Sequence, residues 1–108
     1  MDIQIVYIIK GAQLLNDKAV IAYKIGKSSI TSAKRGGFSR RMEDCSTWQA
    51  GYVLLAVQVC KDAETALNLE KKYHKQLSKD CLFINREWFA GSKTDKFVSG
   101  MIKKHGLT

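Results

Sequence analysis

Two side chains that could take part in catalysis or bind a metal ion lie four residues apart in a predicted helix. Residues 62–78, DAETALNLEKKYHKQLS, contain no Pro or Gly, and Asp62 is suited to cap the first turn. At helical spacing Glu70 falls within the apolar side of this helix, and His74 follows one turn later. A carboxylate on an apolar side must be paired, protonated or bound to a metal. Glu70 therefore reaches solvent from the edge of the apolar side, pairs with an arginine of another element, or binds a metal ion. His74 is either a packed or hydrogen-bonded histidine or a ligand.

A second group of candidate residues is basic. Between residues 24 and 41 there are six cations and no acid: Lys24, Lys27, Lys34, Arg35, Arg40 and Arg41. Residues 27–38, KSSITSAKRGGF, are polar and predict a loop whose cations, hydroxyls and backbone suit phosphate contacts; a solvated surface loop is the alternative. Arg40 and Arg41 fall in the first turn of a short helix predicted over 39–47. The helix dipole disfavours cations there, which indicates an anion bound in front of them.

Composition restricts the class of protein. A chain of 108 residues with 45% hydrophobic content predicts a single domain, 1–108, with one modest core. The charge of +8, from 18 Lys and Arg against 10 Asp and Glu, favours nucleic acid as partner before an anionic membrane surface. Cys45, Cys60 and Cys81 form no CxxC pair and indicate reduced, intracellular cysteines. Without a signal peptide or a membrane-spanning run, the sequence predicts a cytoplasmic protein with no membrane partner.

The remaining elements must position these residues. Strands are predicted over 3–10, 20–26 and 52–60, with a bend at Asn16–Asp17 that makes the first two an antiparallel hairpin. Tyr7 and Tyr23 then lie on adjacent strands, and cross-strand packing is the alternative to a functional role for Tyr23. An extended aromatic segment at 82–90 and a helix at 93–105, ended by Gly106, complete the chain. The predicted fold class is α/β in the α+β sense, a small three-stranded, mainly antiparallel sheet flanked by helices.

Helical spacing assigns an apolar face to each of the two long predicted helices. The apolar side of helix 62–78 comprises Ala63, Ala66, Leu67, Tyr73 and Leu77, and its polar side Asn68, Lys71, Lys72, Lys75 and Gln76. In helix 93–105 the shared apolar face comprises Phe97, Val98, Met101 and Ile102.

The order of these motifs resembles the GIY-YIG nuclease superfamily, over nearly the whole chain. Residues 6–8, Val-Tyr-Ile, match the first signature, and residues 24–26, Lys-Ile-Gly, match the second. With Tyr23 before the second motif, an E-x-x-x-H helix at 70–74 and E-W-F at 87–89, the chain is similar to the small phage and microbial branch often described as DNA-binding.

The resemblance implies roles for individual residues. Tyr7 matches the tyrosine that helps to activate the nucleophile, and Glu70 the single acidic ligand of Mg²⁺ or Mn²⁺. Arg41 matches the arginine that binds the scissile phosphate, with Arg35 as the alternative, and Asn85 matches a late asparagine that supports the site. Lys24 occupies the position of the second signature tyrosine. Either Lys24 acts itself, or Tyr23 is displaced into the role, or catalysis has been lost.

Together these matches predict a metal-dependent endonuclease or nickase acting on DNA, most simply double-stranded. The expected catalytic set, Tyr7, Lys24, Arg41 and Glu70, should converge on one concave face. The expected further nucleic-acid contacts are Tyr23, Lys27, Lys34, Arg35, Arg40, His74 and Asn85. The alternatives are a non-catalytic DNA-binding module with the same basic face and, on charge alone, an RNA-binding or membrane-surface protein. The oligomeric state is left open, a homodimer included, and a phage-encoded protein would act in the host cytoplasm.

Overall fold

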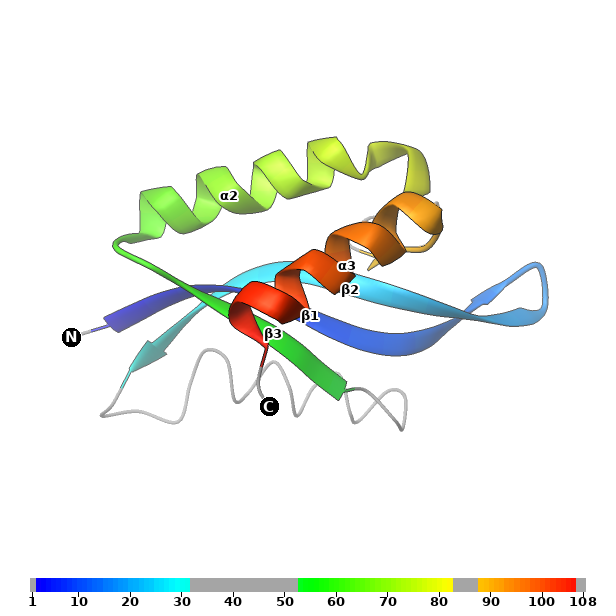
Figure 1. Ribbon diagram of the computed structural model, residues 1–108, viewed down its shortest axis with the longest axis horizontal. Coiled ribbons are helices and arrows are strands. Elements are labelled where there is room, and N and C mark those ends of the chain that lie inside the picture. The colour runs from blue at the N-terminus through cyan, green and yellow to red at the C-terminus, as the bar shows by residue number, and fades with distance from the viewer. Residues whose placement is uncertain (1, 32–52, 83–87, 107–108) are drawn as a thin grey trace.

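The computed structural model describes residues 2–31, 53–82 and 88–106, and it contains one antiparallel sheet with two long helices (Figure 1). The elements in chain order are β1 (Asp2–Leu15), β2 (Lys18–Thr31), β3 (Val53–Cys60), α2 (Ala63–Gln76), a 3-10 turn (Ser78–Asp80), β4 (Trp88–Phe89) and α3 (Ser92–His105). The strand order is β3-β1-β2-β4. The α+β class is confirmed, but the sheet has four strands where the sequence predicted three.

The hairpin of β1 and β2 is longer than predicted. Asn16 and Asp17 have φ values of 52° and 65°, as a two-residue hairpin turn requires, so the predicted bend is confirmed. The strands continue on both sides of it, however, and Asp2 pairs with Thr31 at the far end. Residues 27–31 were predicted as loop because their side chains are polar; that prediction is wrong, because β1 supplies a backbone partner along the whole segment.

The two faces of the sheet build two hydrophobic clusters. The centre of β1, Ile5 to Ile9, is buried on both faces, as predicted. Alternation along the strand sends Val6 and Ile8 to the face covered by the helices, whereas Ile5, Tyr7 and Ile9 lie on the opposite face. We call these the helix face and the Tyr7 face.

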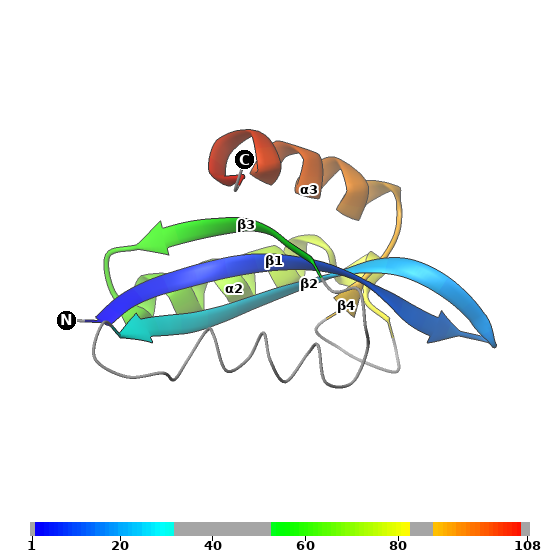
Figure 2. The same cartoon turned by 90° about the horizontal axis from the view of Figure 1, so that it is seen from below.

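Helix α2 packs on the helix face, as Figures 1 and 2 show. It begins as predicted, because the Thr65 N–H donates to Asp62 Oδ1 at 2.7 Å. Ala66 and Leu77 are buried in the core, and Leu69 packs against it although it was left off the predicted apolar side. The prediction for Ala63 was wrong, since it is exposed on the first turn, where the helix has not yet reached the sheet.

Helix α3 lies beside α2 and contacts β3. Val98 and Met101 are buried as predicted, and the Phe97 ring packs against Tyr73 at a centroid distance of 4.9 Å. Ile102 was predicted on the same face but is 40% exposed, because the packed face of the helix ends one position earlier. Gly106 ends the helix, as predicted, with its N–H bonded to the Ile102 carbonyl.

Strand β4 is short and was not predicted. Tyr23 pairs with Phe89 and Lys24 with Trp88, so these two buried residues of the predicted aromatic segment form the edge strand of the sheet. The predicted helix 39–47, with Cys45, falls outside the described residues; Cys60 and Cys81 are free thiols. None of the helices in the described ranges is long and apolar enough to cross a membrane.

Candidate functional site

The first part of the candidate site lies between Tyr7 and Gly26, which face each other on β1 and β2. Tyr7 is fully buried, and its ring lies across the glycine. A Cβ placed on Gly26 would stand 2.6 Å from the Tyr7 hydroxyl oxygen and 2.7 Å from Cζ. Only a residue without a side chain therefore leaves room for the tyrosine in this position.

Strand β2 adds polar groups to this face. Lys24 pairs with Ile9, two residues beyond Tyr7, so the lysine shares the Tyr7 face and is half-buried there. Ser28, opposite Ile5, lies two positions on the other side of Gly26 and is 8% exposed. Within the described residues the Ser28 hydroxyl has no hydrogen-bond partner. Sequence reasoning missed Ser28, although period-two alternation from Lys24 through Gly26 would have placed it on the same face.

The second part of the candidate site is on α2. The His74 Nε2 lies 2.6 Å from the Ile25 carbonyl oxygen, and because a carbonyl can only accept, Nε2 carries the hydrogen. The His74 ring also packs against Phe89, with centroids 5.1 Å apart. This contact fixes α2 to β2 at Ile25, next to Gly26.

The direction of α2 places Glu70 along the same part of β2. The helix starts shortly after Cys60, and Cys60 and Ser29 of β2 both pair with the same residue of β1. It ends near Cys81, which pairs with Phe89, the partner of Tyr23 on β2. It therefore runs antiparallel to β2, as Figure 1 shows. Glu70 is half-buried, and its helical spacing from the buried Ala66 and Leu77 puts it on the sheet-facing side, one turn before His74 and so nearer the Ser28 end of β2. On β2, strand β4 pairs with Tyr23 and Lys24, so no described strand pairs with the following residues along this edge of β2.

The two parts of the site are on different faces of the sheet. Tyr7 and Lys24 share the Tyr7 face, whereas α2 carries Glu70 over the helix face. The expected convergence on one concave face is thus not seen for Tyr7 and Glu70, which flank the Gly26 region from opposite sides. Tyr23 and Lys27 also lie on the helix face by alternation, and Tyr23 packs against the core there.

The remaining predicted site residues lie outside the described ranges. They are Lys34, Arg35, Arg40, Arg41 and Asn85.

The residues around Glu70 determine whether a metal ion fits. Among the described residues no group of three or more His, Cys, Asp and Glu side chains could hold one. Mg²⁺, however, is commonly bound through one or two carboxylates and keeps several waters. Glu70 is half-buried on the sheet-facing side, and its carboxylate has no hydrogen bond or ion pair within the described residues. A half-buried carboxylate without a partner among the described residues is chemically suited to bind a Mg²⁺ or Mn²⁺ ion that keeps most of its waters.

Comparison with known proteins adds no relative: no family model, no curated protein and no solved structure matches the chain.

Proposed function

We propose that the chain is a metal-dependent endonuclease or nickase of the GIY-YIG type that hydrolyses phosphodiester bonds in DNA. The observation that carries the proposal is the packing of the Tyr7 ring over Gly26, with Lys24 next on the same face. This packing brings Tyr7 of the first signature next to Lys24 and Gly26 of the second. It also explains why a glycine stands opposite the tyrosine, since any side chain there would collide with the ring.

The proposed roles follow from the chemistry of phosphodiester hydrolysis. Tyr7 would accept the proton of the attacking water, which requires neighbouring cations to lower the pKa of its phenol from the ordinary value near 10. Lys24, together with Arg41, would stabilise negative charge on the phosphate. Glu70 would hold Mg²⁺ or Mn²⁺, which polarises the phosphate and stabilises the departing oxygen when bound. Because Tyr7 is fully buried, the proposal requires its hydroxyl to become accessible when DNA binds.

A second candidate is a non-catalytic DNA-binding module on the same fold. The placement of Tyr7 and Glu70 on opposite faces favours it, because a nucleophile-activating group and a metal ligand must act on the same phosphate. In that case the net charge of +8 would serve binding alone. Either function would place the protein with intracellular DNA in the cytoplasm, and neither excludes a homodimer.

The test is incubation of the purified chain with supercoiled plasmid and Mg²⁺ or Mn²⁺. The nuclease proposal expects nicked or linear product, which Glu70→Gln abolishes while DNA binding is kept. Glu64→Gln is the matched control, because it removes an exposed carboxylate from the same helix and should leave cleavage unchanged. Salt-sensitive binding without cleavage under either metal supports the binding module instead, and cleavage that survives Glu70→Gln contradicts the assigned metal ligand.

A further inference from the structure

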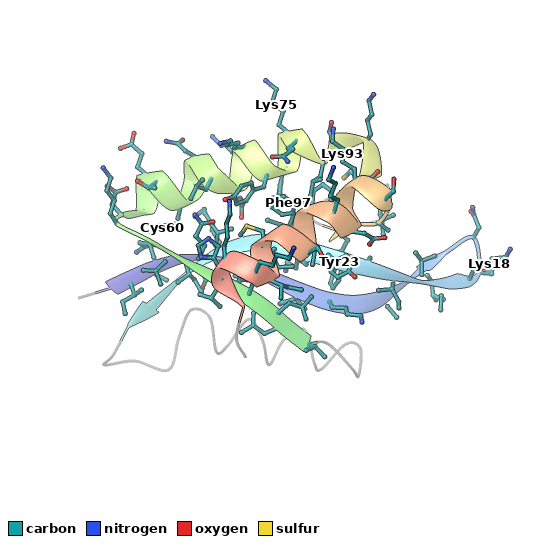
Figure 3. All side chains as sticks on the ribbon, viewed as in Figure 1. Lys18, Tyr23, Cys60, Lys75, Lys93 and Phe97 are labelled. Atoms are coloured by element: carbon teal, nitrogen blue, oxygen red, sulfur yellow. The ribbon has the colours of Figure 1, made fainter. Side chains whose placement is uncertain are left out.

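The outer surface of α2 and of the 3-10 turn after it carries a lysine face that the candidate site does not use. It consists of Lys71, Lys72, Lys75 and Lys79, all of them exposed. Figure 3 shows Lys75 pointing away from the sheet, into solvent. The face lies on the side of α2 opposite its buried residues Ala66 and Leu77, so packing does not explain these side chains.

The lysine face has no acid at neighbouring helical positions. Residues three and four apart are neighbours on a helix, and acids placed there normally offset a lysine. The residues at those spacings on α2 from the first three lysines are Leu67, Asn68, Leu69, His74, Gln76, Ser78 and other members of the lysine face. Like charges at these spacings destabilise a helix, whereas solvated helix faces normally alternate in sign.

The nearest carboxylates are directed elsewhere. The Asp80 carboxylate accepts from the Thr94 N–H at 2.9 Å and from the Thr94 hydroxyl at 2.7 Å. Glu70 lies toward the sheet, and Glu64 lies in the first turn, where the helix dipole favours an acid. The dipole also accounts for Lys75 in the last turn, but not for Lys71 and Lys72 before it.

We propose that the lysine face binds the phosphate backbone of double-stranded DNA. The inference rests on the proposed action on DNA and adds where the duplex is held. From Lys71 to Lys75 the helix rise is about 6 Å, which is about two phosphate spacings along one strand. Lys93 is exposed at the start of α3 (Figure 3). It adds a cation beyond Lys79, because the next residue of the turn, Asp80, accepts a hydrogen bond from Thr94 of α3.

The position of the lysine face relates it to the candidate site. Lys71 directly follows Glu70, and at helical spacing it stands beside the flank of α2 that carries His74. The His74 bond to the Ile25 carbonyl fixes that flank against β2. A duplex held on the lysine face therefore lies next to the flank of α2 that carries Glu70 and His74.

The test measures duplex binding at several salt concentrations for the wild type and two double variants of equal charge. Lys71→Gln/Lys75→Gln removes two cations from the lysine face. Lys103→Gln/Lys104→Gln is the matched control, because it removes two exposed cations from the last turn of α3. The first variant should bind more weakly, and the slope of log K against log salt should shrink by about 2; the control should keep the wild-type slope.

The other outcomes separate a failure of this inference from a failure of the nuclease proposal. Equal losses in both variants mean that only net charge matters, and an unchanged slope in the first means that DNA contacts another surface. Tighter binding to duplex RNA than to DNA at matched salt also contradicts it. If the chain binds DNA through Lys71 and Lys75 but never cleaves, the inference stands and the nuclease proposal fails. If the wild type binds no DNA, both fail.

Discussion

The Tyr7 hydroxyl lies directly over Gly26, on the neighbouring strand, so closely that a single added methyl group would collide with it. The glycine has an ordinary backbone conformation, since the positive φ values in the described residues belong to Asn16, Asp17 and Gly91. Space, not backbone strain, is therefore what requires glycine at this position.

Substitution of Gly26 by Ala should destabilise the protein. The new Cβ would meet the ring of a tyrosine that is fully buried, and overpacking of this kind costs about 1–3 kcal/mol. Urea unfolding of the wild type and variant measures the difference. Gly100→Ala is the control: nothing lies within 4 Å of its added Cβ, and the change should stabilise α3 by about 0.5–1 kcal/mol. Equal stability of Gly26→Ala and the wild type would show that the tyrosine can move aside.

Features that depend on neighbouring residues could be predicted from the sequence, whereas features that depend on pairing between distant segments could not. The Asp62 cap and the Asn16–Asp17 turn were predictable because each depends on residues within three positions. That Tyr7 and Glu70 lie on opposite faces of the sheet was not predictable. Alternation assigns the residues of a strand to two faces, but it does not say which face a later helix covers. Strand β4 was missed for a similar reason: two residues long, it exists only through its pairing with Tyr23 and Lys24.

A second prediction concerns Asp80, which joins the 3-10 turn to α3. Asp80→Ala should lower the free energy of unfolding by about 1–3 kcal/mol, because the Thr94 N–H and hydroxyl both lose their acceptor. Thr94 is fully buried, so water cannot replace that acceptor without rearrangement.

Two variants make the Asp80 result specific. Asp80→Asn keeps an amide oxygen and should lose less than Asp80→Ala in the same urea titration. Asp95→Ala, which removes an exposed acid from the first turn of α3, should change stability by only a few tenths of a kcal/mol. A loss for Asp95→Ala as large as that for Asp80→Ala would point to charge rather than to the two hydrogen bonds.

The third prediction concerns the His74 contact that fixes α2 to β2. His74→Ala should destabilise the protein by about 1–3 kcal/mol, since it removes the donor to the Ile25 carbonyl and the packing against Phe89. Amide hydrogen exchange should also become faster along α2. Lys75→Ala, at the next and exposed position, is the control and should leave both measurements close to wild type. If exchange in α2 is unchanged in His74→Ala, other contacts hold the helix.

The last prediction concerns stability at alkaline pH. Burial raises the pKa of Tyr73. Its hydroxyl donates a hydrogen bond to Gln58 Oε1 at 2.8 Å, which the phenolate cannot make. The phenol in the unfolded chain therefore ionises first. The contribution of Tyr73 to stability is fully present below its ordinary pKa of 10.0 and is lost as pH rises through the higher folded-state value. Burial raises the pKa of the Cys60 thiol from 9.0 as well, which adds a loss of the same sign.

The variant Tyr73→Phe isolates the tyrosine. At neutral pH it should lose about 0.5–1.5 kcal/mol with the hydrogen bond to Gln58, and above about pH 10 its stability should fall less steeply than that of the wild type. Urea unfolding at a series of pH values measures both effects. Cys60→Ser in the Tyr73→Phe background then tests the thiol separately, because any remaining slope near its ordinary pKa should decrease. Parallel curves for Tyr73→Phe and the wild type across this range would mean that the phenol ionises equally in the folded and unfolded chains.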